Sequence, residues 1–372
     1  MTQIPLVDLA AAHAAVAEEV AQGWQDVLAT TAFVGGPQVA AFEREFAGFC
    51  GVRDCVAVAN GTDAIEIPLR ALGIGTGDEV ILPANSFVAT AEAVCRAGAT
   101  PVLVDCADDD TYLMDTDAAI AAVTSRTRAF IPVHLYGQIA PVERLAQVAQ
   151  DTGAAIIEDA AQSHGALRDG KSAGSFGSAA AISFYPGKNL GAYGDAGAVL
   201  TDAADIATLS RLIRDHGAAR KFVHEVLGFN SRMDALQAVV LSAKLRHLAG
   251  WNEARRQAAA RYDAALNGLT EVVLPRTLPG NTHVWHLYVI RVPDRDRVLA
   301  EMLEAGVGAG IHYPAPIHRT RAFASLGAHS GSGPVFPVAD RHAAELLSLP
   351  IYPEITAEQQ ERVVEVLVKA LR

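Results

Sequence analysis

Between residues 80 and 201, short apolar runs rich in β-branched residues alternate with amphipathic stretches. The apolar runs cover residues 80–82, 101–105, 129–134, 154–159, 179–185 and 197–201. They are continuous instead of alternating with polar residues, which is typical of strands that helices cover on both faces. The stretches between them predict helices over 90–98, 141–153 and 206–217. The pattern therefore predicts an α/β domain built on a mainly parallel sheet.

The pattern changes near Leu245. Further along the chain we expect a long Ala/Arg-rich helix, a Pro/Gly-rich connection, a strand, a helix and a final helix that begins at the capping-box pattern Thr356-x-x-Gln359. The first four of these elements are predicted over residues 247–266, 274–280, 286–292 and 297–305. We therefore divide the chain into an N-terminal segment with a large α/β domain, residues 1–245, and a smaller C-terminal α+β domain, residues 246–372.

The charge balance narrows the classes of partner. The chain has 372 residues, with 30 Lys and Arg against 42 Asp and Glu, so its formal net charge is −12. The electrostatic field of a protein with this negative charge does not attract nucleic acid or an anionic membrane surface. The N-terminal segment lacks the basic and apolar pattern of a secretory signal, so we expect a cytoplasmic protein. Four cysteines without CxxC spacing predict buried, reduced thiols and no metal centre.

Lys188 is the lysine with the most unusual surroundings. The apolar run at 179–185 leads to it through the turn Pro186-Gly187. This places the amine at the carboxyl end of a buried strand, where open α/β sheets bind ligands. Burial among apolar groups disfavours the ammonium form, so a neutral amine able to form an imine becomes accessible. The alternative is a surface lysine. The other four lysines are expected in solvent: Lys171, Lys221, Lys244 and Lys369.

Asp159 ends the apolar strand predicted over residues 154–159 and is followed by Ala-Ala-Gln-Ser-His. An aspartate at this point often only caps the next turn. A cofactor with a pyridine ring, however, needs a carboxylate at its ring nitrogen to keep that nitrogen protonated. Asp159 is therefore a candidate for that contact.

Two further segments could contact a cofactor. Asn60-Gly61-Thr62 precedes a predicted helix that runs to Leu72, and a helix N-terminus with a glycine suits a phosphate, although a plain N-cap turn has the same pattern. Phe87 follows the strand at 80–82 and could stack on a planar ring, or it could be an ordinary core aromatic.

Together these segments resemble the DegT/DnrJ/EryC1/StrS family of pyridoxal-phosphate-dependent sugar aminotransferases. The resemblance rests on an ordered set of motifs that spans nearly the whole chain. They are PLVDL at 5–9, GGP at 35–37, NGT at 60–62, PVHLYG at 132–137, EDAAQ at 158–162, SFYPGK at 183–188, GFNSRM at 228–233 and LPIYP at 349–353. The resemblance implies the aspartate aminotransferase-like architecture known as fold type I, with pyridoxal 5'-phosphate as cofactor.

The resemblance also implies the roles of individual residues toward the cofactor ring. Lys188 would form the covalent link with the aldehyde, and Asp159 would hold the pyridine nitrogen. Phe87 would stack on the ring, and Gln162 would contact its hydroxyl side.

The phosphate would be held by residues from two subunits. Gly61, Thr62 and Ser183 would bind it from one subunit, and Asn230 would reach in from the partner. The resemblance therefore implies a homodimer with its active sites at the subunit interface.

The expected reaction is a transamination in two halves. L-glutamate would give its amino group to the cofactor, and a nucleotide-linked keto sugar would then receive it. Lys188, freed as an amine, is the natural base to move the proton because it stays tethered within reach. Related dehydratases carry histidine in place of this lysine, so Lys188 favours transamination.

The segment at 189–197, NLGAYGDAG, looks like that of relatives that aminate C3 of a dTDP-linked 3-keto-6-deoxy sugar. By the same similarity Tyr185, His312 and Tyr313 would face the sugar. A nucleotide diphosphate is anionic, so nearby cations must neutralise it. Our hypothesis assigns this task to three residues, Arg220, Lys221 and Arg232.

Three alternatives stay open at this point. The chain could aminate C4 of a 4-keto sugar, could perform different pyridoxal-phosphate chemistry such as dehydration, or could be a non-catalytic regulator that has kept the fold.

Overall fold

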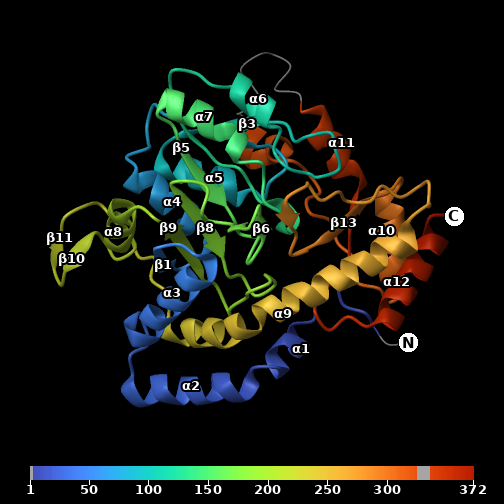
Figure 1. The fold of residues 1–372 in the computed structure, drawn as a ribbon, viewed down its shortest axis with the longest axis horizontal. Coiled ribbons are helices and arrows are strands. Elements are labelled where there is room, and N and C mark those ends of the chain that lie inside the picture. Colours follow the sequence, from blue (N-terminus) through green and yellow to red (C-terminus); the bar gives the residue numbers. More distant parts are fainter. Residues whose placement is uncertain (1–2, 325–335) are drawn as a thin grey trace.

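A seven-stranded sheet forms the centre of the molecule (Figure 1), which is a computed structural model describing residues 3–324 and 336–372. The strand order is β1-β9-β8-β5-β4-β2-β3, and β9 alone runs in the direction opposite to the other six strands. The strands are β1 (Asp54–Val58), β2 (Glu79–Pro83), β3 (Thr100–Val104), β4 (Thr127–Phe130), β5 (Ala155–Asp159), β8 (Ala179–Ser183) and β9 (Gly197–Thr201). The expected mainly parallel α/β sheet is confirmed, and the sequence pattern missed β1.

The strands are apolar along their length because helices cover both faces of the sheet. Along β8, Ala180 and Ile182 belong to one hydrophobic cluster, whereas Ala179 and Ala181 belong to the other. Helices α3 (Gly36–Cys50), α7 (Glu143–Thr152) and part of α9 (Ala235–Leu266) line the first cluster. Helices α4 (Gly61–Ala71), α5 (Ala89–Ala97) and α8 (Ala204–Ile213) line the second. Continuous apolar runs are therefore what this geometry requires.

The C-terminal part has its own apolar core. Strands β13 (Tyr288–Arg291) and β14 (Leu346–Leu349) pair antiparallel and pack with α10 (Arg295–Glu304) and α12 (Ala357–Ala370). The capping box predicted before α12 is present, because the Thr356 hydroxyl accepts from the Gln359 N–H and the Gln359 side chain accepts from the Thr356 N–H.

Helix α9 joins the two parts. It begins at Ala235, so the expected start at residue 247 was wrong: Ala238 and Leu241 already pack in the large core. Its other end, around Tyr262, packs in the C-terminal core. The proposed domain boundary at residues 245 and 246 therefore falls within this helix. Lys244 is only 4% exposed, and its amine donates to the Gly191 carbonyl at 2.7 Å, which corrects its expected place in solvent.

The remaining elements are short or peripheral. They are α1 (Leu9–Ala14), α2 (Ala17–Thr30), α6 (Thr116–Ala121), α11 (Pro337–Glu345), β6 (Leu167–Arg168), β7 (Lys171–Ser172), β10 (Ala218–Arg220), β11 (Val223–His224), β12 (Asn281–Thr282) and the 3-10 turns η1 (Leu135–Gly137) and η2 (Ile317–Arg319). Cys50, Cys55 and Cys106 are buried free thiols, whereas Cys95 is exposed because it lies on the outer side of α5. Within the described ranges, no helix combines the length and the apolar character needed to cross a membrane.

Candidate active site at the carboxyl ends of the sheet

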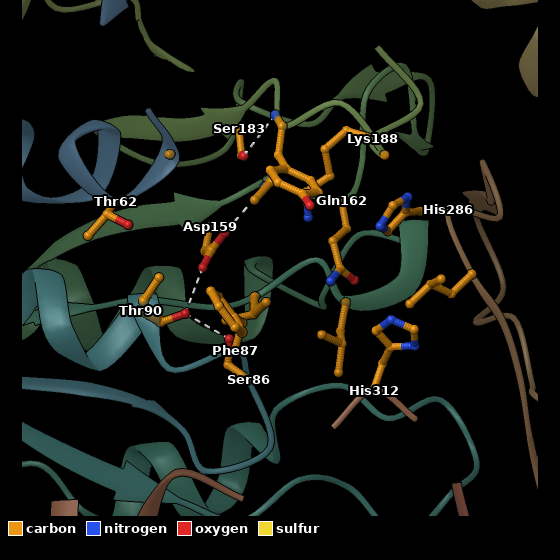
Figure 2. Close-up of a pocket in the computed structure, with 18 of the residues that line it drawn as sticks. Thr62, Ser86, Phe87, Thr90, Asp159, Gln162, Ser183, Lys188, His286 and His312 are labelled. Atoms are coloured by element: carbon orange, nitrogen blue, oxygen red, sulfur yellow. Dashed lines mark hydrogen bonds between the residues drawn. The ribbon is translucent and has the colours of Figure 1, made fainter. Parts of the chain in front are cut away.

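A cavity of about 420 Å³ lies at the carboxyl ends of the parallel strands (Figure 2). It brings together most of the residues that the sequence singled out, although they come from distant segments. The predicted residues on its wall are Gly61, Thr62, Phe87, Asp159, Gln162, Ser183, Tyr185, Lys188, His312 and Tyr313. This location is where open α/β sheets bind their ligands.

Lys188 reaches the cavity through the turn after β8. Its backbone N–H donates to the Tyr185 carbonyl at 2.8 Å, which closes the turn that the Pro186-Gly187 pair predicted. Burial lowers the pKa of the Lys188 amine to about 8, and the nearby Asp159 charge opposes that shift. A substantial fraction of the amine is therefore neutral near physiological pH, as a nucleophile or base requires.

Asp159 is held at the end of β5 by two donors. The Thr90 hydroxyl donates to Oδ2 at 2.8 Å, and the Ala161 N–H donates to Oδ1 at 3.2 Å. Burial nevertheless raises the pKa of the Asp159 carboxyl, against the effect of the Thr90 hydrogen bond. A buried carboxylate of this kind is stabilised by a cation, so it suits a protonated ring nitrogen.

The N-terminus of α4 faces the same cavity. The Asn60 side chain caps this helix by accepting from the Asp63 N–H at 2.9 Å. Gly61 contacts Ser183 closely, since a Cβ on Gly61 would lie 2.6 Å from the Ser183 Cβ. Free N–H groups at a helix start, next to Thr62 and Ser183 hydroxyls, form a site suited to a phosphate.

Aromatic and amide groups form another part of the cavity wall. The Phe87 and Tyr313 rings have centroids 5.3 Å apart. Gln162 accepts from the Tyr136 N–H at 2.6 Å and donates from Nε2 to the Tyr313 hydroxyl at 3.1 Å. His312 lies behind them, with Nδ1 2.8 Å from the Ser348 hydroxyl. Phe87 and Tyr185 are about half exposed, at 51% and 59%, and so mark the open side of the cavity.

Four predicted residues do not line this cavity: Arg220, Lys221, Arg232 and Asn230. Lys221 lies on the β10–β11 hairpin with its amine 5.2 Å from the Phe222 ring centroid. Arg232 pairs with Asp215 at 2.9 Å. Asn230, which is exposed, forms a backbone bridge with Asp215.

Sequence reasoning missed several polar groups on the cavity wall. Thr90 and Ser86, whose hydroxyls lie 2.7 Å apart, were not singled out, although their i, i+4 spacing at the start of α5 was a usable signal. His286 was treated only as the first residue of a strand. His164, which follows the Asp159 motif in the sequence, does not line the cavity: its Nε2–H donates to the Ser183 carbonyl at 2.8 Å, and burial lowers its pKa to about 3.

A mainly parallel sheet that presents a buried lysine, a carboxylate and a helix N-terminus in one cavity defines the fold type I class of pyridoxal-phosphate-dependent enzymes. Residues 14–368 match the DegT/DnrJ/EryC1/StrS aminotransferase family, and the chain belongs to this family. The expectation drawn from the ordered motifs is thereby confirmed.

The relatives include named sugar aminotransferases. The chain is 44% identical to the UDP-N-acetyl-3-dehydro-alpha-D-glucosamine 3-aminotransferase of Acidithiobacillus ferrooxidans, covering 100% of this chain and 98% of that protein. It is 42% identical to the dTDP-3-amino-3,4,6-trideoxy-alpha-D-glucose transaminase of Streptomyces venezuelae, over 98% and 95% of the two proteins. The crystal structure of S. venezuelae DesV superposes with a TM-score of 0.96 at 41% identity and covers 100% of both chains.

Proposed function

We propose that this chain is a cytoplasmic, homodimeric aminotransferase that moves an amino group from L-glutamate to C3 of a nucleotide-linked 3-keto-6-deoxy sugar, with dTDP as the nucleotide. The proposal rests on one observation: Lys188, Asp159 and the start of α4 line the same cavity. The chain also belongs to an aminotransferase family. Two relatives named for amino groups at C3 of UDP- or dTDP-linked sugars support the substrate class.

The residues present fit pyridoxal 5'-phosphate. The contact between Gly61 and Ser183 leaves no room for a Cβ, and both residues line the cavity with Thr62 at the start of α4. We assign the phosphate to Gly61, Thr62 and Ser183, and the ring nitrogen to Asp159. When bound, the cofactor would supply an electron sink for the carbon that loses a proton.

Lys188 would move that proton. With the pKa of its amine near 8, Lys188 can both accept and return a proton at physiological pH. Its place after a tight turn keeps the amine inside the cavity throughout, which avoids the entropy cost of recruiting a separate base. Phe87 would stack on the ring, and Gln162 would fix the ring's hydroxyl side while it also holds Tyr313 in place.

The sugar would enter from the open side of the cavity. Tyr185 marks that side, His312 and Tyr313 also line the cavity, and we assign all three to the sugar. Each offers a hydroxyl or ring nitrogen, which suits a substrate rich in hydroxyl groups.

The cations for the nucleotide diphosphate would come from a second subunit. Arg220, Lys221 and Arg232 lie outside the cavity of their own chain, as residues that complete a partner's site must, and so does Asn230, which we assign to the cofactor phosphate. The hairpin that carries Lys221 projects from the edge of the molecule in Figure 1 and exposes Phe222 to 83%. Leu227, just beyond the hairpin, is 86% exposed. Such apolar exposure is typical of a contact surface.

The test is to incubate the purified protein with glutamate and with thymidine- and uridine-linked 3-keto and 4-keto sugars. Product mass and NMR spectra report which carbon receives the amino group. We expect amination at C3. Amination at C4 would establish the alternative regiochemistry. A protein that binds the cofactor but aminates none of these sugars would overturn the proposal in favour of the regulator or of other chemistry.

A further inference from the structure

His286 lies on the cavity wall near Lys188, on the side where Gln162 and His312 also lie (Figure 2). Its backbone is fixed by the turn η1. The Val284 N–H donates to the Gly137 carbonyl at 2.9 Å. A Cβ on Gly137 would lie 2.9 Å from the backbone nitrogen of His286. Gly137 has a φ of +115°, so glycine is required there both for its conformation and for this close approach.

A chain of hydrogen bonds determines which nitrogen of His286 carries the proton. The His164 carbonyl can only accept, so Asn252 must donate to it from Nδ2, at 2.8 Å, and Asn252 Oδ1 is left as an acceptor. Asn189 Nδ2 donates to that oxygen and to the Val284 carbonyl, both at 2.9 Å. Asn189 Oδ1 can therefore only accept.

The remaining partner of Asn189 Oδ1 is His286 Nδ1, at 3.1 Å. Because the oxygen accepts, Nδ1 must carry the hydrogen. Burial and the nearby Lys188 charge lower the pKa of His286 well below its usual range, so the ring is neutral. A neutral ring with its proton on Nδ1 has a bare lone pair on Nε2. Among the described residues, the contact with Asn189 is the one hydrogen bond of the His286 ring, and it uses Nδ1, not Nε2.

Neighbouring buried histidines adopt the opposite tautomer. His283 Nδ1 accepts from the Trp285 N–H at 2.9 Å, and His134 Nδ1 accepts from the Ala140 N–H at 3.2 Å, so both rings protonate Nε2. His164 also donates from Nε2. His286 therefore differs from these three rings, and it is the one of the four that lines the cavity.

We propose that His286 is a substrate-binding residue whose Nε2 accepts a hydrogen bond from a hydroxyl group of the sugar. Because Nε2 is an acceptor, it repels a carboxylate, which is also an acceptor. The contact at Nε2 therefore favours the hydroxyl-rich sugar over the carboxylates of the amino donor. The identity of the substrate rests on the proposed function above, whereas the tautomer does not.

The first test is NMR spectroscopy of the cofactor-loaded protein labelled with ¹⁵N-histidine. Long-range proton–nitrogen correlations distinguish a protonated from a bare ring nitrogen, and the His286→Asn spectrum identifies the His286 signals by their loss. We expect a protonated Nδ1 and a bare Nε2 for His286, with the reverse pattern for His283. A protonated Nε2 on His286 would overturn the proposal.

The second test compares two variants. In His286→Asn the amide nitrogen replaces Nδ1 and keeps the bond to Asn189, but the acceptor is lost. In His286→Gln the amide oxygen lies near the place of Nε2 and keeps the acceptor. We expect His286→Asn to raise KM for the keto sugar by roughly three- to tenfold, as for the loss of one hydrogen bond. His286→Gln should stay within about twofold of the wild type.

The glutamate half-reaction is measured through the absorbance of the cofactor. It distinguishes a role of His286 in sugar binding from a structural role. Its rate should be nearly unchanged in His286→Asn, and the surface variant His247→Asn should match the wild type in both assays. An equal rise of the sugar KM in His286→Asn and His286→Gln, or an unchanged sugar KM in both, would refute the role in sugar binding. If the wild type aminates no keto sugar, the proposed function fails and the sugar contact fails with it, while the NMR result still decides the tautomer.

Discussion

Burial and charge act in opposite directions on Lys188. Burial removes the solvation that favours the ammonium form, and the Asp159 charge restores part of that preference. Asp159 is itself kept in place by Thr90, so the state of the amine depends on contacts among three segments of the chain. The sequence could predict Lys188 and Asp159, because Asp159 ends one apolar strand and Lys188 follows another through a recognisable Pro-Gly turn. It could not predict the bond from Thr90 to Asp159 or the role of His286, because both depend on hydrogen bonds between distant segments.

Asp159→Asn should therefore lower the pKa of Lys188 below about 8 in the cofactor-free protein. The negative charge favours the ammonium form, so its removal leaves a larger neutral fraction at any given pH. Competitive acetylation across a pH series, read by mass spectrometry, measures this pKa. Lys244 is a matched internal control, because burial alone lowers its pKa to about 8, and it should not shift. An unchanged Lys188 pKa in Asp159→Asn would contradict the electrostatic coupling.

At the scale of elements, strands buried on both faces were the easiest to predict. Their continuous apolar runs follow directly from the two cores on either side of the sheet. Strand β1 and the first turns of α9 were missed for different reasons. β1 lies before residue 80, outside the region where apolar runs and amphipathic stretches alternate, and it pairs with β9, far along the chain. Helix α9 has buried residues on changing sides as it passes from one core to the other, so its periodicity is weak.

The contact between α4 and β8 gives a prediction at this scale. Gly61→Ala would place a Cβ 2.6 Å from the Ser183 Cβ, so the helix or the strand must shift. We expect a loss of about 1–3 kcal/mol in the free energy of unfolding and clearly weaker binding of pyridoxal 5'-phosphate. Denaturant unfolding and equilibrium dialysis measure the two effects.

Gly250→Ala is the matched control for this substitution. Gly250 lies in α9 with open space around it, so alanine should stabilise the protein by about 0.5–1 kcal/mol and leave cofactor binding unchanged. Equal behaviour of the two variants would mean that the close contact at Gly61 has no energetic importance.

At the scale of the whole molecule, the chain presents an open cavity at one place and the candidate residues for the nucleotide diphosphate at another. Residues that complete a second subunit's site cannot be placed from the contacts of one chain, because their partners lie in the other copy. The family resemblance therefore supplied Asn230, and the charge of a nucleotide diphosphate supplied the hypothesis for Arg220, Lys221 and Arg232, where residue patterns alone predicted only solvated groups.

Mixing two inactive variants tests this arrangement. Lys188→Ala removes the amine from its own cavity, and Asn230→Ala should damage the cavity of the partner. A mixed dimer then has one intact site, so random exchange of subunits should restore about a quarter of the wild-type activity. Each variant alone gives the baseline. If the mixture stays at the level of the separate variants although exchange is verified by native mass spectrometry, Asn230 acts within its own subunit.

The most direct test of the account is to reduce the cofactor-loaded protein with borohydride and locate the adduct by peptide mapping. Lys188 and Lys244 both have amines with a pKa near 8, but only Lys188 lines the cavity with Asp159. We predict a single pyridoxyl adduct, on Lys188. An adduct on Lys244 or on another residue, or a protein that retains no cofactor, would contradict the account.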